Sequence, residues 1–195
     1  MLPKAILFDM DGTLTRPMLD FPRIKQEMGI GSRAILEAMA EMDSVRLAQC
    51  QAILDRHEQH AAEHSQLNDG CAETLSLLKT WDVGMALITR NSRQSVETVL
   101  VKHGLVFAHV FSRETEPPKP HPHALQLACG LLDVTIDEAW MVGDGRYDIE
   151  AGTAAGMKTV WISHGKEKDF PAQPWRTVSD LWAFIELLKQ CERSA

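Results

Sequence analysis

The chain has 195 residues, of which 45% are hydrophobic and 24% are charged, and its formal net charge is -7. This length allows one well-packed domain with an inserted module and excludes two large domains, while the ordinary composition excludes extended disorder, collagen and a long coiled coil. The acidic balance argues against non-specific binding to nucleic acid, which needs a basic surface, but leaves a small anionic substrate open because local cations can outweigh a diffuse negative charge.

We expect a cytoplasmic protein, because no stretch reaches membrane-spanning length and the chain enters an apolar run at Ala5 with no signal-like segment ahead of it. The cysteines are widely spaced and form no Cys-x-x-Cys pair, so we interpret them as small buried or half-buried thiols, which fits a reducing compartment. They are Cys50, Cys71, Cys129 and Cys191. We expect no nucleic-acid or membrane partner, and a monomer or homodimer.

Short apolar runs recur along the chain, as expected for strands that are buried on both faces. They cover residues 4–8, 84–88, 108–111, 139–142 and 158–162. Amphipathic stretches of helical length cover 71–81, 92–103, 122–132, 147–155 and 179–190. Ser92 is the expected N-cap of one of these helices, and Gly104 is its expected end. This alternation predicts right-handed βαβ units and an α/β fold with a Rossmann-like, doubly wound parallel sheet.

Residues 15–68 break this alternation, because they contain helical patterns at 32–42 and 45–65 but no strand-like run. An all-helical insert after the first strand would stand over the carboxyl ends of the strands, where open α/β sheets bind ligands. We therefore predict a core of residues 1–14 and 69–195 and a small helical cap of residues 15–68. Asn68-Asp69-Gly70 is a turn signal and the expected return hinge.

Two carboxylates follow the first predicted strand in the run Asp9-Met10-Asp11-Gly12-Thr13. Carboxylates this close are costly to bury unless a cation neutralises them, and Mg²⁺ commonly lies between carboxylates and a substrate phosphate. In such a site Asp9 can attack phosphorus, and Asp11 can protonate the leaving alcohol. Gly12 would let the backbone turn sharply beside the phosphate. By itself, the same run could also be an acidic turn after a strand.

Three further places carry polar groups that fit the same site. Thr89 follows the predicted strand 84–88, just before a helix N-terminus that can hold an anion. Lys119 is a single cation between prolines, and Asp144 and Asp148 lie four residues apart, between a strand and a helix start. Each of these features alone has an ordinary structural explanation, as a cap, a loop lysine or a helix-terminal carboxylate.

Taken together and in this order, the motifs resemble those of the haloacid dehalogenase-like hydrolase superfamily, and they are closest to its phosphoglycolate phosphatase-like branch. The family pattern is Asp-x-Asp-Gly-Thr, a Ser or Thr after the second core strand, a Lys or Arg before a later helix, and Gly-Asp-x-x-x-Asp. All four parts occur here, and the resemblance covers nearly the whole chain. The chain departs from many members at Thr15-Arg16-Pro17 and in its short insert, which leaves the substrate open.

The resemblance implies a role for each matching residue. Asp9 would be the nucleophile and a metal ligand, and Asp11 would be the acid/base and a backbone-carbonyl ligand. The metal site would also include Asp144 and, directly or through water, Asp148. The expected substrate or phosphate contacts are Gly12, Thr89, Arg90, Asn91 and Lys119, and Arg16 is a further candidate.

We therefore expect a Mg²⁺-dependent phosphatase that hydrolyses a small phosphorylated metabolite, a phosphomonoester, through an aspartyl-phosphate intermediate. The alternatives are a sugar phosphomutase of the same superfamily and a non-catalytic binding module on the same fold. A dehalogenase is disfavoured by Asp11, and a phosphonatase is disfavoured because Lys25 is the only lysine of the insert and nothing marks it as a Schiff-base residue. The histidines His57, His60 and His64 share one helix face, and we interpret them as polar surface and not as a transition-metal site.

Overall fold

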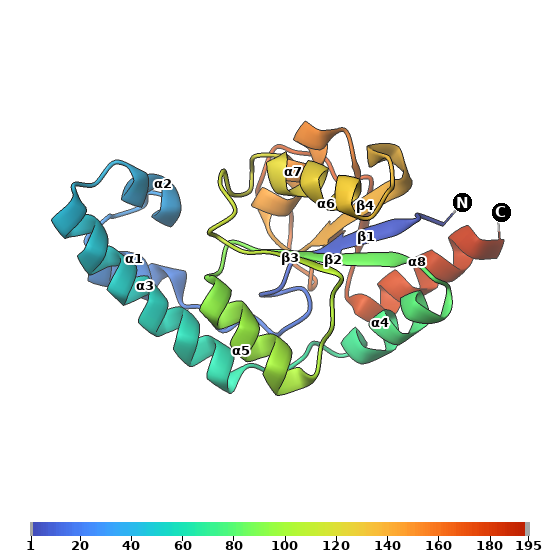
Figure 1. Cartoon of the computed structure of the whole chain (residues 1–195), viewed down its shortest axis with the longest axis horizontal. Helices are drawn as coiled ribbons and strands as arrows, with labels where there is room; N and C mark the ends of the chain where they lie inside the picture. The colour runs from blue at the N-terminus through green and yellow to red at the C-terminus, as the bar shows by residue number, and fades with distance from the viewer. Residues whose placement is uncertain (1, 194–195) are drawn as a thin grey trace. The chain divides into compact units, whose positions relative to one another are not determined.

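The computed structural model describes residues 2–193, within which six strands form one parallel sheet (Figure 1). The strands lie in the order β3-β2-β1-β4-β5-β6. Their bounds are Ala5–Phe8 (β1), Gly84–Ile88 (β2), His109–Phe111 (β3), Ala139–Gly143 (β4), Lys158–Ile162 (β5) and Arg176–Val178 (β6). The order runs outward on both sides from β1, so the predicted doubly wound α/β fold is confirmed.

Helices cover both faces of this sheet (Figure 1). Helix α4 (Cys71–Thr80) and helix α8 (Leu181–Arg193) pack together on one face, where the rings of Phe8 and Phe184 meet edge to face with centroids 6.2 Å apart. Helices α6 (His123–Leu131) and α7 (Arg146–Ala155) lie on the other face. Because both faces are covered, the side chains of β1 are completely buried, which explains its uninterrupted apolar run.

A second compact unit consists of Met18–Ser65 and Asn91–Leu105. It contains the helices α1 (Phe21–Met28), α2 (Ile35–Ala40), α3 (Ser44–His64) and α5 (Arg93–His103). Apolar side chains from α1, α2 and α3 form its core, namely Ile24, Met28, Ile30, Ile35, Ala38, Met39, Cys50 and Leu54. Residues 18–65 are thus helical, as the sequence predicted, although the sequence analysis did not identify α1.

Helix α5 belongs to this second unit because polar contacts tie it to α3. The carboxylate of Glu58, which is only 2% exposed, accepts the N–H of Ser92 at 2.9 Å at the start of α5. Near the other end of α5, Lys102 Nζ donates to the carbonyls of Glu63 and Ser65 at 2.7 and 2.8 Å. The sequence analysis had placed α5 in the core, and the boundaries 15 and 68 of the cap stay a prediction.

Local capping signals account for the helix ends that the sequence predicted. The hydroxyl of Ser92 accepts the N–H of Ser95, and Gly104 ends α5 in the left-handed conformation with φ 63°. Gly156 ends α7 in the same way. The strand β6 was not predicted, since it has three residues and little burial.

The predicted placement of the cysteines is confirmed, since Cys50, Cys71 and Cys129 are buried and Cys191 is half-buried, and all four thiols are free. Burial raises the pKa of Cys71 to about 12 and that of Cys129 to about 11, so both stay protonated at neutral pH. Among the described helices, none combines the length and the apolar character that crossing a membrane requires.

Substitution of two helical glycines tests how closely α7 packs against the sheet. A Cβ at Gly152 would overlap the methyl group of Thr159 on β5, whereas a Cβ at Gly130 on α6 would meet no atom within 4 Å. We expect Gly152→Ala to lower the free energy of unfolding by about 1–3 kcal/mol through overpacking. Gly130→Ala should leave it unchanged or raise it by up to about 1 kcal/mol, because alanine is the better helix former. Urea denaturation measures both, and equal effects would contradict the close packing.

Candidate active site

Two aspartates lie side by side because they follow neighbouring parallel strands. Asp9 follows β1 and Asp144 follows β4, and the two strands pair with Phe8 opposite Val142. The N–H of Asp9 extends this ladder by donating to the carbonyl of Val142 at 2.9 Å. Parallel strands end at the same edge of a sheet, so the pairing register brings both carboxylates to the carboxyl edge.

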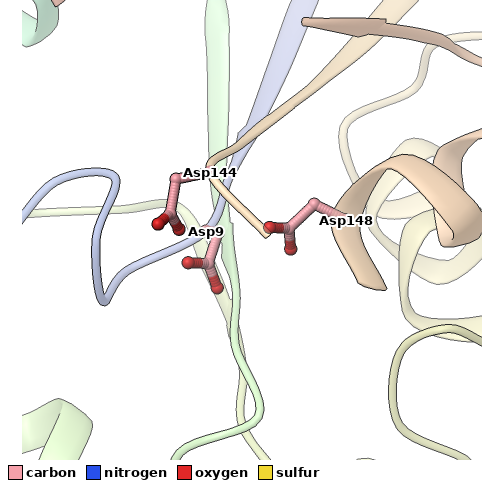
Figure 2. A group of neighbouring side chains, drawn as sticks. All are labelled: Asp9, Asp144 and Asp148. Atoms are coloured by element: carbon pink, nitrogen blue, oxygen red, sulfur yellow. The ribbon is translucent and has the colours of Figure 1, made fainter. Parts of the chain in front are cut away.

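A third carboxylate comes from the first turn of α7. Asp148 accepts the N–H of Gly145 at 3.0 Å, which fixes its side chain at the start of the helix. Figure 2 shows it pointing toward Asp9 and Asp144. One carboxylate oxygen from each residue lies within 4.8 Å of the others, and Asp9 and Asp148 are buried while Asp144 is half-buried. In residues 2–193 this is the one group of three or more acidic, histidine or cysteine side chains close enough to share a metal ion.

A buried lysine lies against this cluster. Lys119 is 2% exposed, and its Nζ donates to Asp9 Oδ1 at 2.7 Å, to Asp148 Oδ1 at 2.5 Å and to the carbonyl of Ile88 at 2.6 Å. An ammonium group has three hydrogens, so each of them meets an oxygen. The backbone of Lys119 is held in turn, because the guanidinium of Arg90 donates to its carbonyl. Arg90 also stacks on the ring of Tyr147, 4.0 Å from its centroid.

Burial and mutual repulsion act on the protonation of these groups. Burial raises the pKa of Asp9 to about 7, although the charge of Lys119 opposes this effect. The pKa of Asp144 is also raised to about 7, first by burial and then by the charges of Asp148 and Asp11. Burial lowers the pKa of Lys119, but the charges of Asp148 and Asp9 outweigh it, so that the pKa lies above its ordinary value. The lysine is therefore charged, and it compensates only part of the negative charge around it.

Glycines leave the space that the carboxylates occupy. Gly12 has φ 88°, and a Cβ there would overlap the carboxylate of Asp144. A Cβ at Gly143 would overlap the carboxylate of Asp148. The indole N–H of Trp161 donates to the carbonyl of Asp144 at 2.8 Å and holds the backbone at this point. The glycines of both motifs are thus required by close contact with the acidic side chains.

Comparisons with known proteins identify a family for this chain. A family model for haloacid dehalogenase-like hydrolases matches residues 19–162. Phosphoglycolate phosphatase 1 of Pseudomonas aeruginosa is 29% identical over 192 residues, a match that covers 84% of this chain and 71% of the relative. N-acetylmuramic acid 6-phosphate phosphatase of the same species is 28% identical over 186 residues, covering 83% and 82%. A crystal structure of a hydrolase from Pseudomonas syringae matches with a TM-score of 0.77 and 16% identity, covering 95% and 98% of the two chains.

The chain belongs to the haloacid dehalogenase-like hydrolase family. The phosphatase relatives confirm the resemblance to the phosphoglycolate phosphatase-like branch, and the solved structure confirms the fold. The matched region includes Lys119, Asp144 and Asp148, while Asp9 and Asp11 precede it.

Four of the predicted site residues meet in one cluster, namely Asp9, Lys119, Asp144 and Asp148. The other predicted residues of this haloacid dehalogenase-like chain make different contacts. Thr89 is buried directly after β2, and its N–H donates to the carbonyl of Phe111 at 2.9 Å. Asp11 is half-buried, and its charge acts on Asp144. Arg16 forms an exposed ion pair with Asp69 at 2.9 Å. Asn91 falls in the second compact unit, so its role as a phosphate contact stays a prediction.

The contacts of the helical histidines lie within the second compact unit. His57 contacts the carboxylate of Glu27 at 3.1 Å, and the rings of His60 and His64 lie 4.2 Å apart. Glu27 also accepts from Arg23 and Arg56, so His57 joins a surface ion-pair network. Their interpretation as polar surface agrees with these contacts.

Two residues that sequence reasoning did not assign to the site contact its loop. Asn68 Nδ2 donates to the carbonyls of Gly12, Thr13 and Thr15 at 3.0, 2.8 and 3.0 Å. His164 Nε2 lies 2.7 Å from the carbonyl of Gly12. The sequence analysis interpreted Asn68 as a turn residue only. The place of His164 two residues after β5, at the carboxyl edge of the sheet, was a signal that could have identified it.

A matched pair of glycine substitutions tests the close packing of the second acidic motif. We expect Gly143→Ala to displace the carboxylate of Asp148 from Lys119 and to lower phosphatase activity by about 10²-fold, because small misplacements in a catalytic site are costly. Gly145→Ala places its Cβ 3.3 Å from Asp148, so a much smaller loss is expected. Steady-state kinetics with an aryl phosphate measures both. Equal losses would show that the packing against Asp148 does not control activity.

Proposed function

We propose that this chain is a Mg²⁺-dependent phosphatase that hydrolyses a small phosphomonoester through an aspartyl-phosphate at Asp9. The observation that carries the proposal is the buried Asp9 carboxylate at the end of β1, grouped with Asp144 and Asp148 and 2.7 Å from Lys119 Nζ. The phosphatase names of two relatives support it.

The donor set of the site fits a hard divalent cation. Asp9, Asp144 and Asp148 offer three carboxylates, and Lys119 supplies one positive charge. Burial and the neighbouring carboxylates raise the pKa values of Asp9 and Asp144, so a further cation would favour their ionised forms. Oxygen donors of this kind suit Mg²⁺ better than a soft transition metal. We assign the metal ligands to Asp9, the backbone carbonyl of Asp11, Asp144 and Asp148. The cation, when bound, would withdraw charge from the phosphoryl oxygens.

The chain's own carboxylates carry out both chemical steps of the proposed reaction. A carboxylate oxygen of Asp9 attacks phosphorus, the ester P–O bond breaks, and the Asp11 carboxyl group gives its proton to the departing alcohol. In the second step Asp11 takes a proton from water, the water oxygen bonds to phosphorus, and the bond between Asp9 and phosphorus breaks. The products are the alcohol and inorganic phosphate, and both aspartates return to their starting state.

Lys119 has two tasks in this proposal. Its charge opposes the effect of burial on Asp9 and so favours the carboxylate form that attacks. It would also stabilise negative charge on the phosphoryl oxygens, together with Gly12, Thr89, Arg90 and Asn91. The three Nζ hydrogens already meet oxygens, so a phosphate oxygen would have to share one of them. Arg90 holds the backbone of Lys119 by donating to the carbonyl of that residue.

The substrate is proposed only as a class. The two relatives act, by their names, on phosphoglycolate and on an amino-sugar phosphate, which share a phosphate ester and differ in the rest of the molecule. We propose that residues 15–68 form the cap that selects among such esters and limits the access of water. The chain enters this insert directly after the loop of Asp9 and returns at 66–68, which pairs with residues 14–16. A cytoplasmic location and a monomeric or homodimeric state also stay predictions.

Replacement of the nucleophile tests the proposal. We expect the native chain to release phosphate from an aryl phosphate with Mg²⁺ and to lose this activity on chelation. Asp9→Asn should be inactive at the background level, because an amide oxygen is a poor nucleophile. Asp137→Asn is the matched control, since this aspartate is exposed and outside the acidic cluster. Assay of inorganic phosphate measures all three.

Two outcomes would overturn parts of the proposal. Full activity in Asp9→Asn, or none in the native chain over a panel of phosphomonoesters, would contradict the nucleophilic mechanism. Transfer of the phosphoryl group between positions of a sugar phosphate, without release of phosphate, would instead identify a phosphomutase.

A further inference from the structure

We propose that Asn68 and His164 are positioning residues that hold the loop carrying Asp9 and Asp11, and that Asp11 depends on them for proton transfer to the leaving group. The juxtaposition that points to this role is the convergence of both side chains on one acceptor, the carbonyl of Gly12. The inference rests on the proposed phosphatase mechanism, and it adds two residues to it.

Most backbone donors of the loop after β1 converge on one acceptor. The backbone N–H groups of Thr13, Leu14 and Thr15 all donate to the carbonyl of Met10, at 3.3, 2.9 and 3.0 Å. The hydroxyl of Thr15 donates to the same carbonyl at 3.2 Å. Most of the turn's own donors thus go to one oxygen, and the N–H of Gly12 donates to the carbonyl of Thr15 at 2.9 Å. The carbonyls of Gly12 and Thr13 therefore need donors from elsewhere in the chain, and that of Thr15 can accept a second one.

Asn68 supplies donors to all three carbonyls. Its Nδ2 lies 2.8 to 3.0 Å from each of them, so its two hydrogens are shared among three oxygens, whereas the amide oxygen could not donate to any. Its backbone is fixed as well, because its N–H donates to the carbonyl of Leu14 at 2.8 Å and its own carbonyl accepts from Cys71 at the start of α4. The half-buried side chain is thus held in one place by the loop and by the helix that follows.

His164 approaches the same carbonyl from the other end of the chain. Its Nε2 must carry a hydrogen, since the oxygen of Gly12 at 2.7 Å can only accept. The backbone of His164 has φ 50°, which is uncommon for a residue other than glycine, and its N–H donates to the carbonyl of Ser179 at 3.0 Å. Because surrounding contacts maintain this uncommon backbone conformation, we infer that the side chain of His164 is held in one position.

These contacts bear on Asp11 because Gly12 is the next residue in the chain. Gly12 has φ 88° and is packed against the carboxylate of Asp144, so its peptide has little freedom on that side. Asn68 and His164 fix the direction of its carbonyl. If both hold the peptide, the carboxyl group of Asp11 keeps one direction, as a general acid must. Loss of a donor should therefore weaken protonation of the leaving group more than attack by Asp9.

The dependence of the rate on the leaving group separates this role from a merely structural one. An alkyl alkoxide needs a proton to leave, whereas a nitrophenolate leaves readily without one. The test compares kcat/KM, which reports the steps up to the phosphoenzyme, for an alkyl phosphate and for 4-nitrophenyl phosphate. A variant that is only less folded loses the same factor on both esters.

The variants follow from the donor chemistry. Asn68→Asp keeps the shape of the side chain but places an acceptor against three carbonyls. We expect kcat/KM to fall by about 10²-fold on the alkyl ester, with a clearly smaller loss on the nitrophenyl ester. His164→Phe should show the same selective loss, and His164→Gln, which retains an N–H donor at a similar reach, should restore much of it. Asp69→Asn is the neighbouring control, because its exposed ion pair with Arg16 contributes little.

The outcomes separate this inference from the proposed function. A native chain without activity on either ester would contradict the phosphatase proposal itself. A native chain that is active, with variants that lose equal factors on the two esters or none, would overturn the positioning role. If Asn68→Asp fails to fold, the comparison of His164→Phe with His164→Gln decides the question, since it leaves the turn of residues 66–70 unchanged.

Discussion

Three carboxylates and one ammonium group share a largely buried site, and this placement of charge constrains the rest of the structure. Removing one partner of a buried ion pair typically costs about 3–5 kcal/mol, because the other charge is left uncompensated. Lys119 contacts two of the carboxylates, and the charge of Lys166 also favours the ionised form of Asp144. Such a group needs a rigid frame to hold its charges in place, and the further cation that we propose would complete the balance.

The parallel sheet supplies that frame. Register between β1 and β4 places Asp9 beside Asp144, the first turn of α7 adds Asp148, and the carbonyl of Ile88 at the end of β2 accepts from the lysine. The four charged residues are spread over 140 positions of sequence and meet because three neighbouring strands end at one edge. The space for them exists because Gly12 and Gly143 have no side chains. Fold and site are therefore consequences of the same pairing of strands.

The sequence predicted the features that depend on the order of neighbouring residues in the chain. Buried strands appear as apolar runs, and the polar residues that follow them, such as Asp9, Thr89 and Asp144, could be assigned to one edge of the sheet. Packing partners could not be predicted in this way: the apolar pattern of α5 does not say that it belongs with α3. Asn68 and His164 could not be predicted because they contact the backbone carbonyl of Gly12, from which they are 56 and 152 residues away in the sequence. Every residue has a backbone carbonyl, so the sequence does not indicate which one a side chain contacts.

The central claim is that this acidic cluster is completed by a divalent cation, and thermal unfolding at increasing Mg²⁺ tests it most directly. The account predicts that the melting temperature of the native chain rises with Mg²⁺, by the equivalent of about 2.7 kcal/mol at a hundred times the dissociation constant. Asp144→Asn should melt at a higher temperature than the native chain without Mg²⁺, because one repelling charge is gone, and should gain little from the ion. Equal gains in both chains, or no gain in the native one, would contradict the account.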